Sequence, residues 1–444
     1  MKRRWTRRQI LSGAALAATG CVVAGTHRSG SAWASAVFGP GPGQRGADTL
    51  VCLFLRGGAD GLNMVVPFGE DDYYRLRPTL AIAPPGDRTQ PVGARALDLD
   101  GFFGLHPALG ALLPYYRDGW MAVVHAVGSG DHTRSHFEAM ATMERGLHAG
   151  TGVASGWLGR HLAATAREVE SPLRAVAISD TLPDSLRGAT TVTALQHLSE
   201  FRLVAPRTEL PEEAHARDHQ DRTDALTQTL RALYRGAGGA PEDPVVRGGR
   251  ESLAAMEAVR QIDPANYRPA PGAQYPDDVL GRAFQQVACL IKADAGLEVA
   301  CLDMGGWDTH FGQGRDTGLQ PRLLQILGDT LAAFLTDLGP RAQHTTLLVM
   351  TEFGRRAYEN YSLGTDHGRA SVMLLLGAHV VGGRVHAEWP TLAKDRLEDG
   401  GDLRVTTDYR DVLAEVVRYR LKNPALQEVF PGYVPRMRGV VRPG

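Results

Sequence analysis

Short, continuous apolar runs recur along the chain and alternate with segments of helical periodicity. The apolar runs cover residues 49–55, 121–127, 174–178, 297–302, 345–350 and 371–376. Such runs are typical of strands that are buried on both faces of a parallel sheet. Helical spacing is found at residues 135–147, 279–293, 323–338 and 408–419. The alternation predicts βαβ units and therefore an α/β fold with a mostly parallel central sheet.

Two of these helices carry finer predictions. In the first, the apolar residues Phe137, Met140, Met143 and Leu147 fall on one side of the helix. In the last, Asp408 stands where an N-cap is expected.

A polar segment at residues 205–277 interrupts the alternation. It mixes acidic and basic residues, has helical patterns near 225–234 and 252–262, and closes with the Pro-rich residues 264–276. We interpret it as a helical insertion in one α/β domain that spans residues 49–444. The chain has 444 residues, of which 43% are hydrophobic and 22% charged, so it can bury a large core.

The first 34 residues have the layout of an export signal. A basic start is followed by a weakly apolar stretch at residues 10–25 and by the small-x-small sequence Ala32-Trp33-Ala34. The apolar stretch is shorter than the ~20 residues that a membrane span needs, so a transmembrane anchor is the less favoured alternative. Lipid attachment at Cys21 also ranks below soluble export. The Gly/Pro-rich residues 35–48 are expected to form a flexible tail.

Charge and cysteine content narrow the classes of function. Removing residues 1–34 takes away six of 48 basic residues and none of the 49 acidic ones, which leaves 42 against 49 and a net charge of −7. This balance argues against a general nucleic-acid-binding protein but is compatible with a local pocket for an anionic substrate. The remaining cysteines, Cys52, Cys289 and Cys301, lie in apolar surroundings and are interpreted as small buried residues.

Polar motifs lie next to three of the predicted strands. Gly-Gly-Trp-Asp-Thr-His at 305–310 and Thr-Glu-Phe-Gly-Arg at 351–355 follow apolar runs, and Gly-Thr-Asp-His-Gly at 364–368 precedes one. In open α/β sheets, ligands bind where strands meet loops. Carboxylate and imidazole groups without a thiolate suit Zn or Mn. The candidate ligands of such a divalent ion are Asp308, His310, Glu352, Asp366 and His367.

Two further groups follow predicted strands. Asp60 stands in the Gly-rich turn 56–61, where it is either a turn-forming residue or a ligand. Ser135 falls near a helix start, where backbone N–H groups favour an anion, and is either a helix cap or a nucleophile. Beside it, Arg134 could bind a pair of phosphate or sulfate oxygens, and His136 could serve as an acid or base.

Together these motifs resemble the bacterial, twin-arginine-exported family called domain of unknown function 1501. The residues Thr6-Arg7-Arg8-Gln9-Ile10-Leu11 are similar to the twin-arginine signal. The other matching segments are 54–63, 105–109, 134–137, 306–310, 351–355 and 364–368. The resemblance implies export by the twin-arginine translocase to the periplasm or the medium, with no stable membrane span in the mature chain.

That family is similar to the alkaline phosphatase-like superfamily of phosphatases, sulfatases and cofactor-independent phosphoglycerate mutases. The resemblance implies a three-layer α/β/α sandwich with one or two metal ions at the carboxyl ends of the strands. It also implies that Ser135 is the nucleophile and that the metal ligands are Asp60, Asp308, His310, Glu352 and His367, with Asp366 supporting them.

One departure from the superfamily leaves two interpretations open. Glu352-Phe353 stands where the superfamily enzymes have Asp-His, so one imidazole ligand is missing. The first interpretation is an exported metal-dependent hydrolase of small anionic phosphate or sulfate esters, with in-line attack by Ser135. The second is a binding or assembly protein of the cell envelope that keeps the phosphatase-like fold without turnover.

Overall fold

The computed structural model describes residues 48–148, 151–166, 171–189, 191–203, 212–235 and 243–443. The predicted signal (1–34) and nearly all of the predicted tail (35–48) lie outside these ranges. The chain divides into two compact units, one of Met1–Val37 with His197–Tyr267 and one of Phe38–Gln196 with Arg268–Gly444. In the part of the chain that is described, no helix combines the length and apolar character that a membrane crossing requires.

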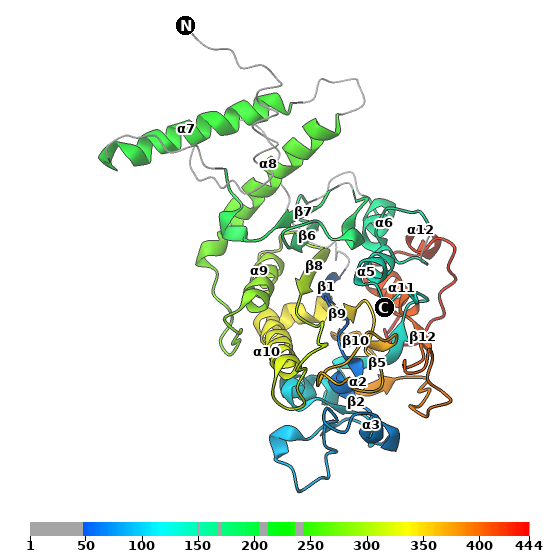
Figure 1. The fold of residues 1–444 in the computed structure, drawn as a ribbon. Helices are drawn as coiled ribbons and strands as arrows, with labels where there is room; N and C mark the ends of the chain where they lie inside the picture. The colour runs from blue at the N-terminus through cyan, green and yellow to red at the C-terminus, as the bar shows by residue number, and fades with distance from the viewer. Residues whose placement is uncertain are drawn as a thin grey trace. The chain divides into compact units, whose positions relative to one another are not determined.

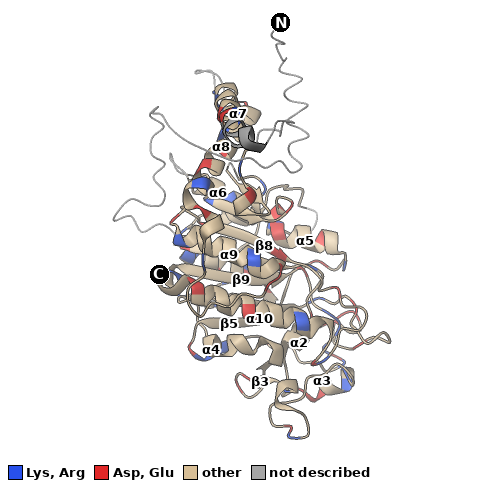
Figure 2. Cartoon of the chain, turned by 90° about the vertical axis from the view of Figure 1, so that its left-hand side faces the viewer, with Lys and Arg blue, Asp and Glu red and all other residues tan. Residues whose placement is uncertain are grey.

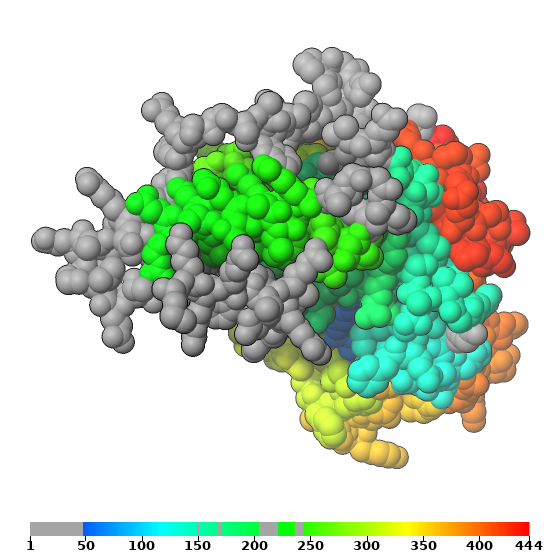
Figure 3. All heavy atoms as spheres, turned by 90° about the horizontal axis from the view of Figure 1, so that it is seen from above, coloured from blue at the N-terminus to red at the C-terminus, as the bar shows by residue number. Residues whose placement is uncertain are grey.

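The smaller unit contains the two long helices of the predicted helical segment. They are α7 (Glu212–Leu233) and α8 (Pro244–Ile262), coloured green in Figures 1 and 3. Gly249 on α8 allows close packing, because a Cβ there would lie 2.4 Å from the ring of Tyr234. Asp243 caps α8 by accepting a hydrogen bond from the backbone N–H of Val245.

The described residues of the larger unit form a nine-stranded sheet (Figure 1). At its centre β1 (Thr49–Leu55) pairs in parallel with β8 (Val299–Met304) and β9 (Thr345–Thr351). On the β8 side, the sheet continues with β6 (Ala175–Ile178) and β7 (Thr193–Leu195). On the β9 side, it continues with β10 (Ser371–Leu376), β5 (Met121–Gly128) and β11 (Arg384–His386). The short strand β12 (Thr407–Asp408) also pairs with β5. All six predicted strands are present, and the mostly parallel sheet is confirmed.

Strand β10 is the exception to the parallel arrangement. It runs antiparallel to both β5 and β9, while the other pairings within this sheet are parallel among the described strands. The start of β10 therefore lies at the same edge of the sheet as the ends of β1, β8 and β9. As a result, a motif that precedes β10 can meet motifs that follow the other three strands.

Helices lie on both faces of the sheet because its strands are apolar on both sides (Figure 1). On one face, Leu50, Cys52 and Phe54 of β1 belong to a core cluster with residues of α6 (Trp157–Ala164), α11 (Tyr409–Glu415) and α12 (Leu426–Val429). On the other lie α9 (Val279–Lys292) and α10 (Leu319–Leu338), which pack against each other. Charged residues gather on helices and loops, and the central strands are largely free of them (Figure 2).

Both helices with finer predictions are present. Helix α5 (His136–Arg145) ends at Gly146 in a left-handed conformation, with a φ of 63°. Of the apolar residues, Met143 and Leu147 are buried, whereas Phe137 is 85% exposed. Asp408 caps α11 through a 2.9 Å bond from the N–H of Arg410, and a π-helical turn at Val416–Arg420 follows.

The remaining elements form a small layer beside the main sheet. They are a three-stranded sheet of β2 (Val65–Val66), β4 (Gly104–Leu105) and β3 (Leu97–Asp98), and the short helices α2 (Gly61–Met64), α3 (Asp71–Leu76) and α4 (Leu113–Arg117).

A buried ion network stabilises the amino end of β8. Glu298, which directly precedes this strand, lies 2.9 Å from Nε2 of His161 and 2.8 Å from Nε of Arg174. Burial favours the protonated carboxyl, but these two partners outweigh it and lower the pKa of Glu298 to about 2. The carboxylate thus joins α6, β6 and β8 within the core.

We expect Glu298→Gln to destabilise the larger unit by on the order of 2–3 kcal/mol at pH 7. A carboxyl whose pKa is depressed by folding contributes this stability above its unfolded pKa, and the contribution is lost as the pH falls from about 4.5 towards 2. The difference between wild type and variant should therefore shrink at pH 3. Urea unfolding followed by tryptophan fluorescence measures it, with the exposed Glu428→Gln as control. If the difference in the free energy of unfolding between wild type and variant is the same at pH 7 and at pH 3, the result would contradict the assigned role.

Candidate metal centre

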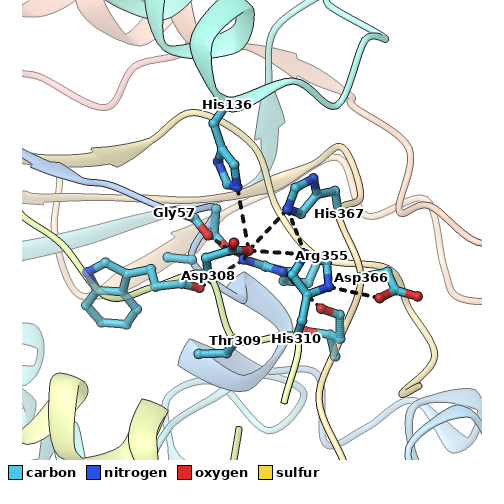
Figure 4. Close-up of polar contacts among 12 residues, drawn as sticks. Gly57, His136, Asp308, Thr309, His310, Arg355, Asp366 and His367 are labelled. Carbon is cyan, nitrogen blue, oxygen red and sulfur yellow. Dashed lines mark hydrogen bonds and ion pairs between the residues drawn. The ribbon is translucent and has the colours of Figure 1, made fainter. Parts of the chain in front are cut away.

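Four chain segments meet at the carboxyl edge of the central strands (Figure 4). Asp308 and His310 lie in the loop after β8, and Glu352 directly follows β9. His367 lies in the loop before β10, and His136 is the first residue of α5. These residues are far apart in the sequence, and the strand order of the sheet brings them together.

Three imidazole rings face one oxygen of Asp308 (Figure 4). The Oδ1 atom lies 3.1 Å from Nε2 of His367, 3.2 Å from Nε2 of His310 and 3.5 Å from Nε2 of His136. The Nε2 atoms of His310 and His367 are 2.9 Å apart. An ion with metal–nitrogen bonds of ~2.0–2.1 Å separates its ligand atoms by about 3 Å, so these spacings fit a shared ion. His136, Asp308 and His367 alone form a compact group of three potential ligands.

Each ring is held by a hydrogen bond on its other nitrogen. The Nδ1 atoms donate as follows: His136 to Glu352 at 2.7 Å, His310 to Asp366 at 2.9 Å, and His367 to the backbone carbonyl of Arg134 at 2.9 Å. An ionised carboxylate or a carbonyl can only accept, so a neutral ring keeps its proton on Nδ1 and turns the Nε2 lone pair towards Asp308. Metal-binding histidines characteristically have such an acceptor behind them.

The pKa shifts of Asp308 and His367 favour the forms that bind a metal, whereas that of His136 favours the protonated ring. Burial opposes ionisation of Asp308, but the hydrogen bond and the charge of Arg355 outweigh it and contribute to lowering its pKa to about 2. Burial lowers the pKa of His367, which favours the neutral ring. The bond to Glu352 raises the pKa of His136, whose Nε2 is buried and has no hydrogen-bond partner among the described residues. A cation at this point would complete the surroundings of that nitrogen.

Arg355 is a functional residue that the sequence analysis missed. Its guanidinium is fully buried and donates to Oδ1 of Asp308 at 2.7 Å and to the carbonyls of Trp307 and Thr365 at 3.0 and 2.9 Å. It also donates to the carbonyls of Gly57 and Gly58. The signal in the sequence was its place at the end of the 351–355 motif, directly after Phe353-Gly354.

Phe353 forms part of the wall of the centre. Its ring centroid lies 4.9 Å from that of His136 and 4.8 Å from that of His367. In the sequence, Phe353 stands where the superfamily has a histidine, so an imidazole ligand was expected to be missing. In the structure His136 brings an imidazole to this place from α5, and Phe353 packs against it.

A glycine permits the loops of the centre to pack together. A Cβ at Gly364 would lie 2.3 Å from the carbonyl oxygen of His310, which is closer than real contacts allow. The glycine of the 364–368 motif is therefore required for the approach of the 305–310 motif.

Asp60 differs from its predicted role as a ligand. It is buried, and its two oxygens accept hydrogen bonds from the Arg77 guanidinium at 2.6 and 3.0 Å. Its Oδ2 also accepts from Nε2 of Gln313 at 2.6 Å. A carboxylate neutralised by a guanidinium in this way stabilises the turn after β1 and has little capacity left for a metal ion.

Arg134 has other partners than the predicted anion, and Ser135 stands at the predicted helix start. The guanidinium of Arg134, predicted to bind an anion, is paired with Asp402 at 2.5 Å and Asp399 at 3.1 Å. Arg134 has a φ of 54°, and its carbonyl orients His367 instead. Ser135 occupies the N-cap position of α5, but its side chain makes no capping hydrogen bond.

Glu352 and Asp366, both predicted as ligands, lie behind the imidazoles. Each accepts a hydrogen bond from a ring Nδ1, and Glu352 also accepts one from the backbone N–H of Gly57 at 2.8 Å. His136, predicted as an acid or base, turns its Nε2 towards Asp308.

The fold and the centre define a mixed α/β protein with one His/Asp/His group able to hold a metal among its described residues. The chain belongs to the family described as protein of unknown function (DUF1501), whose model matches residues 47–416. No curated protein matches the chain.

Two solved structures show a distant similarity. The PH0037 protein from Pyrococcus horikoshii is 11% identical with a TM-score of 0.31, and the match covers 88% of this chain and 99% of that one. The 2-O GAG sulfatase BT1596 is 11% identical with a TM-score of 0.28, covering 89% of this chain and 73% of that one. Because both TM-scores are low, neither similarity adds to the description of the fold.

We expect Asp366→Asn to weaken Zn or Mn binding by about 10–100-fold, because the amide no longer fixes the proton of His310 on Nδ1. Half of the Asp366 side chain is exposed, so the fold should tolerate the change. Competition with a chromogenic chelator measures the affinity, and Asp395→Asn, an exposed carboxylate elsewhere, is the matched control. Equal affinity of both variants would show that Asp366 does not orient a ligand.

Proposed function

We propose that this protein is an exported, metal-dependent hydrolase of phosphate or sulfate esters with an alkaline phosphatase-like fold. The observation that carries the proposal is the convergence of three imidazole Nε2 atoms on one oxygen of Asp308. Lone pairs that face a carboxylate repel it unless a proton or a cation lies between them. A divalent ion between His136, Asp308 and His367 would satisfy these three groups at once, and imidazole with carboxylate suits Zn or Mn.

The chain's own residues divide into two sets. Asp308, His136 and His367 would hold the ion, and His310 lies beside them with its Nε2 2.9 Å from that of His367. Behind them, Glu352, Asp366 and the Arg134 carbonyl fix the rings, and Arg355 fixes the carboxylate of Asp308. One or two bound ions would supply the charge that polarises an ester oxygen and lowers the pKa of an attacking group.

Ser135 is the proposed nucleophile. It directly precedes His136 and stands at the start of α5, where the helix dipole favours an anion. Because its side chain makes no capping bond, the hydroxyl is not committed to the helix. In-line attack by Oγ would transfer the phosphoryl or sulfuryl group from the ester oxygen to Ser135 and release the alcohol, and water would then free the enzyme.

Export rests on the sequence alone. The twin-arginine-like residues 6–11 and the 34-residue signal layout support passage through the twin-arginine translocase to the periplasm or the medium. The substrate would be a small anionic ester encountered there.

A second candidate is a binding or assembly protein of the cell envelope that keeps the phosphatase-like fold without turnover. The state of Arg134 favours it, since the guanidinium expected to clamp an anion is held by Asp402 and Asp399. Both candidates share the phosphatase-like fold. They differ in whether Ser135 reacts.

Two variants separate these candidates. We expect Asp308→Ala to lose bound metal, measured by elemental analysis, and with it the hydrolysis of aryl phosphates and sulfates. Ser135→Ala should keep the metal and lower kcat by roughly 10³-fold or more, because it removes the attacking group. Ser252→Ala, an exposed serine on α8, is the control for Ser135.

The outcomes have distinct meanings. Hydrolysis by Ser135→Ala at the wild-type rate would exclude this serine as nucleophile. If the wild-type protein binds stoichiometric metal but hydrolyses neither aryl phosphates nor aryl sulfates, the result would favour the binding protein. A wild type that binds no divalent metal and hydrolyses neither ester series would remove the basis of the hydrolase and favour the binding or assembly protein.

A further inference from the structure

Large exposed aromatic side chains are concentrated at the metal centre. Among the described residues, three aromatic side chains are largely exposed: Phe137 at 85%, Phe311 at 76%, and Tyr361, which is fully exposed. Phe137 directly follows His136, Phe311 directly follows His310, and Tyr361 lies in the loop that leads to Asp366 and His367. We call these three residues the aromatic rim.

Backbone hydrogen bonds fix two members of the rim side by side. The N–H of Gly312 donates to the carbonyl of Ser362 at 3.0 Å, and the N–H of Gln313 donates to that of Leu363 at 2.9 Å. Asn360 adds a side-chain bond to the His310 carbonyl at 3.0 Å. The loops that carry Phe311 and Tyr361 are thus joined, and Leu363, in the second of these loops, is also exposed.

This distribution is not that of ordinary surface residues. Single exposed apolar side chains are normal on a soluble protein, whereas a group of them marks a binding surface. Exposed apolar residues elsewhere in the larger unit, such as Val92, Val279 and Val434, are aliphatic and scattered over separate elements. An aromatic ring buries about 150–250 Å² when it is covered, so three rings represent a large unused binding surface.

The position of the rim indicates what would cover it. Consecutive Cα atoms are about 3.8 Å apart, so Phe137 and Phe311 start within one residue of His136 and His310. We infer that a small molecule held at the centre could also contact these rings. A bulky protein partner would cover the centre, whereas a small ester could place its anionic group at the ion and its alcohol portion against the rings.

The geometry points to an anionic ester whose alcohol portion is flat and apolar, such as an aryl ester, as the substrate class of this centre. This inference rests on the proposed function and adds the specificity of the same site. Aromatic rings pack well against flat apolar groups in offset or edge-on arrangements and gain little from a methyl group. The rim thus selects the alcohol portion, and the ion would bind the anionic group.

Binding of two non-hydrolysable probes tests the inference without requiring turnover. Zinc-loaded protein is titrated calorimetrically with phenylphosphonate and with methylphosphonate, which carry the same anionic group. We expect phenylphosphonate to bind about tenfold more tightly or better. The triple variant Phe137→Ala/Phe311→Ala/Tyr361→Ala should lose this preference. Val92→Ala/Val434→Ala, which removes exposed apolar groups elsewhere, should keep it.

Elemental analysis of every variant separates a failure of the aromatic specificity from a failure of the proposed metal-dependent function. Equal binding of the two probes by zinc-loaded wild type overturns the aromatic specificity and leaves the metal centre standing. Failure of the wild type to take up zinc overturns the proposed function itself. If the triple variant fails to fold, the single variants Phe311→Gln and Tyr361→Gln replace it. A triple variant that keeps the preference but no longer self-associates by light scattering would make the rim a protein interface and overturn the inference.

Discussion

The buried guanidinium of Arg355 is the interaction on which the arrangement of the centre depends. It donates to carbonyls in the turn after β1, in the loop after β8 and in the loop before β10, and to the carboxylate of Asp308. A planar group with five N–H donors can join acceptors from several directions, which a lysine cannot do. Without it, several buried carbonyls would lose their partners at about 1–3 kcal/mol each. The same contact holds the Asp308 oxygen to which the imidazoles turn.

The direction of β10 explains why the sequence motifs converge. The apolar runs predicted the strands because burial on both faces leaves a clear local signal. They contain no comparable signal for strand direction, which is set by the path of the connecting chain. With β10 antiparallel, the residues before it reach the edge where β8 and β9 end. The Asp308, His310 and His367 group was therefore anticipated from motifs at strand ends, although the orientation of β10 was not.

The roles of individual polar residues were harder to predict from the sequence. Asp60 looked like a ligand because it follows β1, but its partner Arg77 is 17 residues away, and only the fold brings the two together. His136 and Glu352 are separated by 216 residues, so nothing local shows that one orients the other. From the sequence, Phe353 was interpreted as a lost imidazole ligand, because each strand-end position was compared with the superfamily pattern separately. An imidazole that arrives from a helix on another segment is invisible to such a comparison.

The charge balance around the centre limits how an anion could bind there. The described arginines nearest to it are paired with carboxylates: Arg355 with Asp308, Arg134 with Asp402 and Asp399, and Arg56 with Glu144 and Asp303. The centre itself adds Glu352 and Asp366 beside the imidazoles. A phosphate or sulfate ester brought to this edge would meet net negative charge unless further positive charge is supplied. A divalent ion among the three Nε2 atoms would provide it, so the metal and the anionic substrate are electrostatically coupled in the proposed function.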